Sequence, residues 1–169
     1  HVTPSFVIPE MHYVDGDRNA NRFFTDGVAN ELVERNRVYE EAPFLAFHFR
    51  DYREDLPIDH GSVSLLISQY AGFVSESCKK YLARGGYLIA NNSHGDAGLA
   101  SCDREFRLVA VINRRGDRWS LDTRNLSDYF IPKSRTVPRE PSELAGHIRD
   151  LGKGIGYTRT AADYVFEKV

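Results

Sequence analysis

The sequence predicts a doubly wound α/β domain, with a mostly parallel sheet and helices on both of its faces. The segment Val63–Ser68 is almost wholly apolar, which is typical of a strand covered on both faces. This strand is followed by a helical pattern over Phe73–Ala83, by the pair Gly85-Gly86 and by an apolar run over Tyr87–Asn92. This order is typical of a right-handed βαβ unit. The chain has 169 residues, of which 41% are hydrophobic, so we expect one domain with a sizeable core.

The segments before this unit predict two strands with one helix between them. Met11–Asp15 is a short strand that ends in an acidic turn, and Phe44–Phe49 is a second strand. Between them, Asn19–Arg37 carries apolar residues at helical spacing, so a single helix is expected there.

The segments after the unit predict an antiparallel end to the sheet. Phe106–Asn113 and Arg118–Asp122 flank a Gly-Asp turn and form a hairpin pattern. Ser142–Leu151 has the pattern of a helix, and Tyr164–Val169 alternates as a terminal strand.

Charge and composition limit the classes of partner. The net charge is −2, which argues against a bulk nucleic-acid substrate and against an anionic membrane surface. The basic clusters Arg114-Arg115 and Lys133–Arg139 have acids nearby, so we interpret them as solvated faces. Cys78 and Cys102 are expected to be buried thiols in a reducing cytoplasm, with one disulfide between them as the alternative. No apolar run is long enough for a membrane span.

Three stretches carry a resemblance to a known family. Asp51–Ser68 has an acidic residue, then Leu-Pro, then Asp-His-Gly-Ser before an apolar strand. Cys78–Ala90 has a helical segment, Gly-Gly and an aliphatic strand, and the strands Phe106–Asn113 and Tyr164–Val169 form the third stretch. Together the three stretches resemble the Rossmann-like class I methyltransferases, which use S-adenosylmethionine. The first is similar to the segment between the third and fourth strands of that family, the second to its helix and fifth strand, and the third to its last antiparallel pair. The resemblance covers roughly residues 11–169.

One feature of that family is missing from this sequence. No acidic residue followed by G-x-G-x-G precedes Met11, although the family carries this signature after its central first strand. A gap beside Val63–Ser68 would leave backbone groups unpaired. Three explanations stay open: a single domain over residues 1–169 that is incomplete at its amino terminus, a partner chain or homo-oligomer that covers the gap, or a different arrangement of the sheet.

Acidic residues follow the first two predicted strands. The resemblance implies that Asp15 binds the ribose hydroxyls of the cofactor with Asp17 beside it, that Asp51 receives the adenine amino group, and that Tyr52 stacks nearby. The alternative for Asp15 and Asp17 is a turn or helix-cap pair, and for Asp51 and Tyr52 it is a solvated loop.

A second group of candidates follows Val63–Ser68, because ligands bind outside the carboxyl ends of strands in open α/β sheets. The resemblance implies that Ser68 and Gln69 contact the methionine part of the cofactor, with Tyr70 in the catalytic group and Phe73 near the acceptor. Tyr70 and Phe73 would otherwise cap the core.

The richest polar cluster follows the strand over Tyr87–Asn92. His94 is a candidate general base oriented by Asp96, and Asn91 and Asn92 are candidates for orienting the acceptor. A structural role for His94 is the alternative. The histidines have no metal-ligand spacing, and no G-x-S-x-G nucleophile elbow is present, so neither a metal site nor a serine hydrolase is predicted.

The sequence therefore predicts a cytoplasmic methyltransferase-like domain that binds S-adenosylmethionine and acts on an unidentified acceptor. The alternative is a catalytically silent interaction module that has lost cofactor binding, which the missing glycine-rich loop favours. The fold alone does not decide between them.

Overall fold

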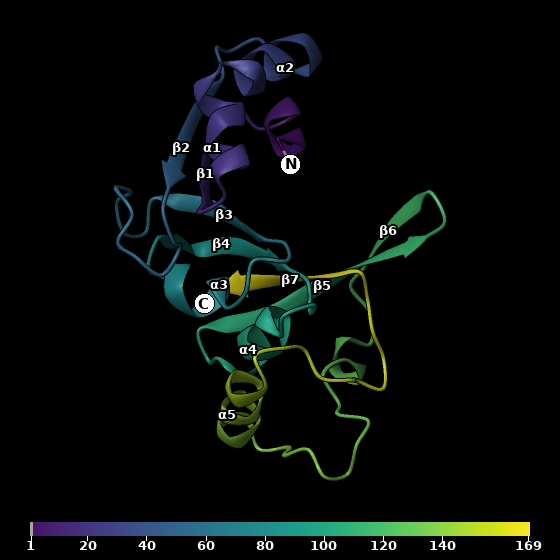
Figure 1. Cartoon of the computed structure of the whole chain (residues 1–169). Coiled ribbons are helices and arrows are strands. Elements are labelled where there is room, and N and C mark those ends of the chain that lie inside the picture. Colours follow the sequence, from purple (N-terminus) through teal and green to yellow (C-terminus); the bar gives the residue numbers. More distant parts are fainter. Residues whose placement is uncertain (1) are drawn as a thin grey trace. The chain divides into compact units, whose positions relative to one another are not determined.

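A computed structural model describes residues 2–169, which divide into two compact units: the first ends at Leu56 and the second is Pro57–Val169 (Figure 1). The first unit contains η1 (Thr3–Phe6), β1 (Glu10–Asp15), α1 (Arg18–Thr25), α2 (Val28–Asn36) and β2 (Phe44–Phe49). The second contains β3 (Val63–Ser68), α3 (Val74–Cys78), β4 (Leu82–Ala90), α4 (Asp96–Cys102), β5 (Phe106–Arg115), β6 (Arg118–Asp122), η2 (Leu126–Asp128), α5 (Pro141–Leu151) and β7 (Asp163–Lys168).

In the first unit, β1 and β2 form a parallel pair that runs in register from Glu10 beside Phe44 to Asp15 beside Phe49. The connection between these strands carries two helices where one was predicted. Gly27 separates them, because its φ of 79° is left-handed and ends the regular helical path. Both strands were predicted at these positions, so the local spacing of apolar residues was sufficient to locate them.

The second unit contains a five-stranded sheet in the order β3-β4-β7-β5-β6. Of the neighbouring pairs in this sheet, β3 with β4 is the parallel one; β7 is antiparallel to both β4 and β5, and β5 is antiparallel to β6. The predicted doubly wound, mostly parallel sheet is therefore wrong. The terminal strand overturns it by inserting between β4 and β5. The predicted hairpin and the pairing of Phe106–Asn113 with the terminal strand are confirmed.

Two local predictions fail around β4. The helix expected over Phe73–Ala83 is the short α3, and Gly85-Gly86 lies inside β4 instead of ending a helix. Gly85 has a φ of 78°, and the β3–β4 register shifts across this segment, so the glycines form an irregularity in the strand. The polar segment after β4 leads into α4.

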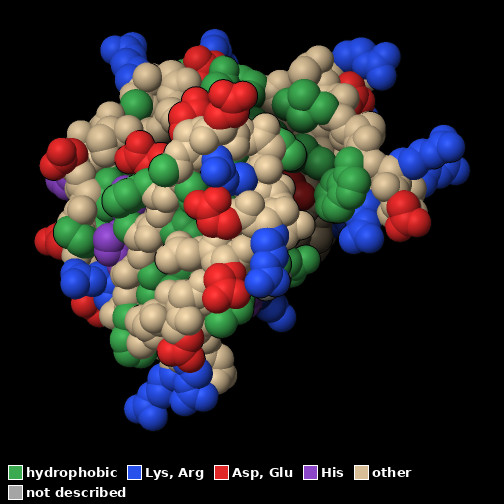
Figure 2. Space-filling model, turned by 90° about the horizontal axis from the view of Figure 1, so that it is seen from above, with side chains coloured by type: hydrophobic (Ala, Val, Ile, Leu, Met, Phe, Trp, Pro, Cys, Tyr) green, Lys and Arg blue, Asp and Glu red, His purple; other side chains and the backbone are tan. Residues whose placement is uncertain are grey.

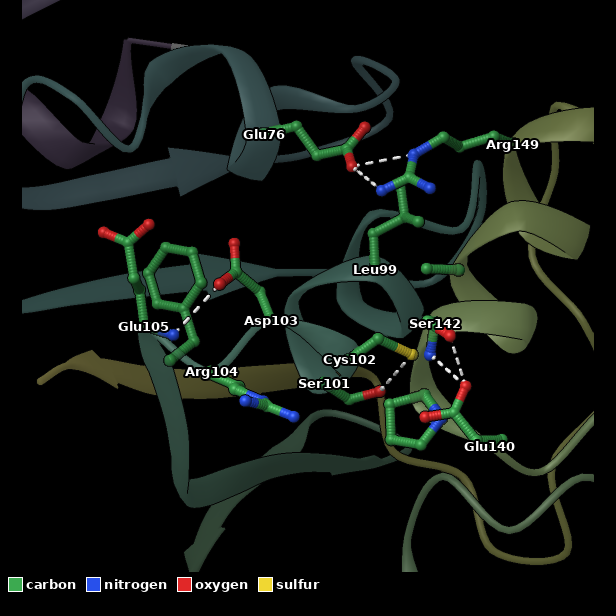
Figure 3. A pocket seen from close by; sticks show the side chains of 13 residues that line it. Glu76, Leu99, Ser101, Cys102, Asp103, Arg104, Glu105, Glu140, Ser142 and Arg149 are labelled. Atoms are coloured by element: carbon green, nitrogen blue, oxygen red, sulfur yellow. Dashed lines mark hydrogen bonds and ion pairs between the residues drawn. The ribbon is translucent and has the colours of Figure 1, made fainter.

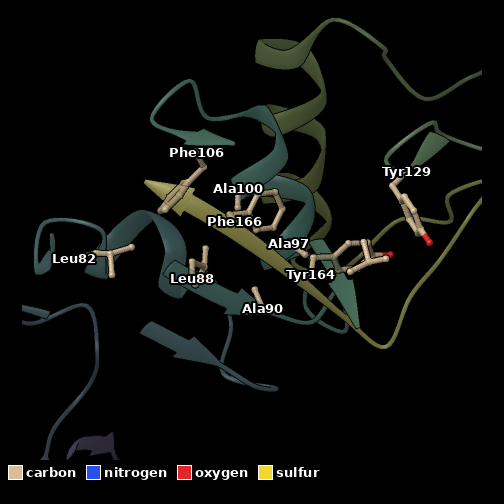
Figure 4. Close-up of a cluster of buried hydrophobic side chains, with 10 residues drawn as sticks. Leu82, Leu88, Ala90, Ala97, Ala100, Phe106, Tyr129, Tyr164 and Phe166 are labelled. Atoms are coloured by element: carbon tan, nitrogen blue, oxygen red, sulfur yellow. The ribbon is translucent and has the colours of Figure 1, made fainter. Parts of the chain in front are cut away.

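The main core of the second unit lies on one face of its sheet (Figure 4). Leu88, Val111 and Phe166 from three strands pack there with Ala97 and Ala100 of α4. In turn, α3 and α5 contact α4, so the helices of this unit are layered on that face. This differs from the expected arrangement with helices on both faces.

The strand β3 occupies an edge of this sheet, with β4 as its neighbour. Its apolar residues Val63, Leu65, Leu66 and Ile67 are half-buried, whereas complete burial was expected. Within residues 2–169, no helix is long and apolar enough to cross a membrane.

Candidate functional site

Two chain segments start side by side where the parallel strands β3 and β4 end. Ser68 and Ala90, the last residues of these strands, are register partners. Residues 69–73 and 91–96 therefore leave the sheet together. Nearly all of the candidates that sequence patterns indicated in this half of the chain lie on these two segments.

A chain of amide and carboxylate groups joins the two segments to the start of β7. Asn91 Nδ2 donates to Gln69 Oε1 at 2.9 Å, and Gln69 Nε2 donates to Asp163 Oδ1 at 2.8 Å. Asn91 Oδ1 accepts from the backbone N–H and the hydroxyl of Ser93, at 3.1 and 2.7 Å. Asn91 is buried, and Ser93 is exposed. This network fixes the polar surface at the strand ends.

Tyr70 is exposed although its backbone is strained. It has a φ of 57°, a left-handed conformation that costs a side-chain-bearing residue roughly 1–2 kcal/mol. Its side chain is 74% exposed. Burial of the ring cannot offset this cost within the chain, and strained residues of this kind cluster at functional sites. Phe73, in contrast, packs against the cluster of Leu99 and Ile148, as expected of a residue that caps the core.

Asp96 has a structural role in this region, because its carboxylate faces the interior of the unit. Ser68 Oγ donates to Asp96 Oδ2 at 2.5 Å, and the Ser75 backbone N–H donates to Asp96 Oδ1 at 2.9 Å. Asp96 is 2% exposed, and its burial raises the pKa of the carboxyl group, against the effect of the hydrogen bonds from Ser68 and Ser75. The bonds of Asp96 join β3 and α3 to α4.

His94 and Asn92 have different surroundings. His94 is exposed, and the carboxylate expected to orient it is bonded to Ser68 and Ser75. Asn92 Oδ1 accepts from the Gly98 N–H and its Nδ2 donates to Ile155 O, both at 3.2 Å. Asn92 therefore holds a neighbouring segment in place, and the His94–Asp96 arrangement expected for general-base catalysis is not formed.

The other four candidates lie in the first unit and make local bonds. Asp17 caps α1 by accepting from the N–H groups of Asn19 and Ala20, and its own N–H donates to Asp15 Oδ1 at 2.8 Å. This is the helix-cap arrangement. Asp51 accepts from the Arg53 guanidinium at 2.5–3.1 Å, which lowers the pKa of its carboxyl group to about 2.

Tyr52, next to Asp51, carries the Arg53 guanidinium 6.0 Å from its ring centroid. The structure thus brings Ser68, Gln69, Tyr70 and Asn91 to one edge of the second unit. Sequence patterns did not indicate Asp163, which is 94 residues from Gln69. The register of β7 on β4 would have pointed to it, because Ala90 pairs with Tyr164 and the next position holds Asn91 and Asp163.

A separate hollow of about 710 Å³ lies among α3, α4 and α5, away from these candidates (Figure 3). Four of its charged side chains, those of Glu76, Asp103, Glu105 and Arg149, take part in ion pairs. Arg149 donates to Glu76 Oε1 through Nε at 2.9 Å and Nη2 at 2.5 Å, and Lys79 binds Asp103 at 2.8 Å.

Two more groups that line this hollow have structural roles or low reactivity. Glu140 accepts from the Ser142 N–H at 2.9 Å and so caps α5. Burial raises the pKa of the Cys102 thiol, which disfavours the reactive thiolate at neutral pH. We therefore assign the candidate site to the strand ends instead of this hollow.

The strand-end site suits binding and orientation better than acid–base catalysis. It offers amide, hydroxyl and carboxylate groups fixed by one another, beside an exposed aromatic ring. Among residues 2–169, no group of three or more His, Cys, Asp or Glu side chains is arranged to hold a metal ion. No family model matches the sequence, and no curated protein matches it significantly.

Proposed function

We propose that this chain binds S-adenosylmethionine at the carboxyl ends of β3 and β4 and takes part in methyl transfer to an acceptor. The observation that carries the proposal is Tyr70, an exposed ring held in a strained conformation next to the fixed Gln69–Asn91–Asp163 network. The resemblance of Asp51–Ser68 and Cys78–Ala90 to class I methyltransferases supports the choice of ligand.

The chemistry of these side chains fits the amino-acid part of such a ligand. A sulfonium is a cation, and cations are attracted to the face of an aromatic ring such as that of Tyr70. The carboxylate of Asp163 can pair with an ammonium group. When bound, S-adenosylmethionine supplies the methyl group, and the side chains position it, which is the main requirement of a displacement reaction.

The fit is weaker in the first unit. Asp15 accepts from the Asp17 N–H and Asp51 binds Arg53, so these carboxylates already have local partners. These bonds, together with the engaged carboxylate of Asp96, favour the second candidate, a catalytically silent interaction module. The two candidates differ in whether a nucleoside ligand binds.

Calorimetric titration separates them. We expect saturable binding of S-adenosylmethionine and of S-adenosylhomocysteine. Tyr70→Ala should weaken binding of S-adenosylmethionine about tenfold, because a ring contact to a cation contributes about 1 kcal/mol or more. Tyr87→Ala is the matched control, since Tyr87 is a second exposed tyrosine on β4, and it should bind as the wild type does. Absence of binding to the wild type would support the interaction module.

A further inference from the structure

The β5–β6 hairpin carries a cluster of arginines around an exposed tryptophan. The hairpin extends beyond the rest of its sheet in Figure 1, and β6 forms the sheet edge. Its last register pair is Arg115 with Arg118, and the pair before it is Arg114 with Trp119. In Figure 2 the hairpin projects at the right, with Arg or Lys side chains and an acidic side chain beside them.

The positive charge of this hairpin is not neutralised by its own acids. Residues 114–124 contain four arginines and two aspartates. Of the acids, Asp122 is bound to Arg124 at 3.1 Å and lies 3.9 Å from Arg159. Within residues 2–169, Arg114, Arg115 and Arg118 form no ion pair. Like charges opposite each other on a ladder, as at Arg115 and Arg118, are destabilising. An anionic partner would remove this cost.

Trp119 adds a stacking surface to this charge. It is 58% exposed, and the Arg114 guanidinium lies 5.1 Å from the centroid of its ring. Arg114 Nε also donates to Gly116 O at 3.0 Å, which holds the guanidinium at the turn. Leu121, two residues along the same strand face, is 65% exposed. With the guanidinium over its ring, the indole still presents exposed flat surface, and large exposed apolar groups of this kind are typical of interaction sites.

We propose that the β5–β6 hairpin binds single-stranded nucleic acid, with phosphates on Arg115 and Arg118 and a base stacked on Trp119. Proteins that bind single strands combine cationic side chains along the backbone with aromatic rings on which bases stack. An acidic protein segment would match the charge but would leave the indole without a flat partner. The near-neutral charge of the whole chain limits long-range attraction, so the binding is local and sensitive to salt.

Trp119 is the single tryptophan of the chain, so its fluorescence reports on this site alone. We expect quenching when a 12-nucleotide oligouridylate is added at low salt, and loss of this binding as salt rises. Polyglutamate of matched charge should cause little quenching. Equal quenching by both polymers, or none by the oligouridylate, would overturn the proposal.

Two pairs of variants locate the binding. Arg115→Ala with Arg118→Ala should weaken oligouridylate binding about tenfold and lower the salt slope by about two, roughly one for each lost phosphate contact. Arg135→Ala with Arg139→Ala removes the same charge from another exposed segment and should leave the affinity unchanged. Equal weakening by both pairs would show that only net charge matters and would overturn the assignment.

The stacking part is tested with a fluorescently labelled oligouridylate and anisotropy. Trp119→Ala should weaken binding about tenfold, because stacking of a base on an aromatic ring contributes strongly to single-strand affinity. Leu151→Ala, which changes an exposed leucine of α5 outside the hairpin, should have little effect. An unchanged affinity for Trp119→Ala would remove the tryptophan from the site. Far-UV circular dichroism confirms that each variant is folded, which is expected because these side chains are exposed.

Discussion

Ser68 Oγ donates a 2.5 Å hydrogen bond to Asp96 Oδ2, which joins the last residue of β3 to the first residue of α4. The same carboxylate accepts from the Ser75 N–H of α3. One buried side chain thus connects three elements at the carboxyl end of the parallel pair. It keeps the segments that carry Gln69, Tyr70 and Asn91 in place.

Removing this carboxylate should destabilise the second unit. We expect Asp96→Ala to lower the free energy of unfolding by about 3 kcal/mol, because it leaves the Ser68 hydroxyl and the Ser75 N–H buried without their acceptor. Urea denaturation measures the loss. Asp96→Asn keeps the shape and one acceptor oxygen and should cost clearly less. A loss below about 1 kcal/mol for Asp96→Ala would contradict a structural role.

Asp96 should also make stability depend on pH. Burial raises the pKa of its carboxyl group above the usual 3.8. Between pH 3.8 and the raised pKa, the native state therefore binds more protons than the unfolded state. Its contribution is complete below pH 3.8 and is lost as the pH rises through the raised pKa. The stability of Asp96→Asn relative to the wild type should therefore increase with pH over this interval. Parallel pH profiles of the two proteins would be inconsistent with a raised pKa.

His48 should give the stability of the first unit the opposite dependence on pH. His12 Nδ1 lies 3.0 Å from His48 Nε2, and the rings are stacked. Burial, then the nearby charges of His12 and Arg50, lower the pKa of His48 below 6.5. A depressed pKa gives stability that is present above pH 6.5 and is lost as the pH falls through the native value.

Hydrogen exchange with mass spectrometry can detect this loss in peptides from β1 and β2. We expect their protection to decrease as the pH is lowered from about 7 to 5, after correction for the intrinsic exchange rate. His48→Gln should reduce the decrease, whereas His94→Gln, which changes an exposed histidine of the second unit, should not. Identical profiles in the wild type and His48→Gln would exclude this histidine as the cause.

Two helical glycines should respond in opposite directions to alanine. A Cβ at Gly98 would lie 2.6 Å from Tyr157 Oη and 2.9 Å from Ile148 Cδ1, and both side chains are fully buried. We expect Gly98→Ala to cost about 2 kcal/mol through overpacking. A Cβ at Gly146 in α5 would contact nothing within 4 Å, so Gly146→Ala should stabilise by about 0.5–1 kcal/mol. Thermal denaturation compares them, and equal shifts would contradict the close packing around Gly98.

Tyr70→Gly should raise stability and lower ligand affinity together. Glycine adopts a φ of 57° freely, so the backbone strain disappears. Glycine also makes the unfolded chain more flexible, which offsets part of this gain. The net increase in the free energy of unfolding should be about 0.5–1 kcal/mol. Asn125→Gly, at a φ of 52°, is the control, because asparagine tolerates this conformation and should gain less. A variant that loses stability would indicate that the tyrosine ring is held for packing and not for a ligand.

Periodicity was enough to locate most strands, because their apolar residues are bounded by turn residues, as at Phe44–Phe49 and Val63–Ser68. The order of the strands could not be obtained in this way. It depends on β7 inserting between β4 and β5, a choice made by contacts such as Leu88 and Leu108 with Phe166 that are distant in sequence. Gly85-Gly86 was ambiguous, since the same pair can end a helix or distort a strand.

The candidate site could be predicted in part. The rule that ligands bind at strand ends selected Gln69, Tyr70 and Asn91 correctly as neighbours. It could not show that the Asp96 carboxylate faces inward, since this follows from its bonds with Ser68 and Ser75. Asp163 was missed because its place beside Gln69 depends on the register of β7.

We propose that S-adenosylmethionine binds at the ends of β3 and β4. Ultraviolet cross-linking of the radiolabelled compound, followed by tryptic mapping, tests it most directly. We expect label in the peptides Glu54–Lys79 and Gly85–Arg104, which contain Tyr70 and Asn91, and loss of that label when S-adenosylhomocysteine competes. Label confined to other peptides, or no label that the competitor removes, would contradict it.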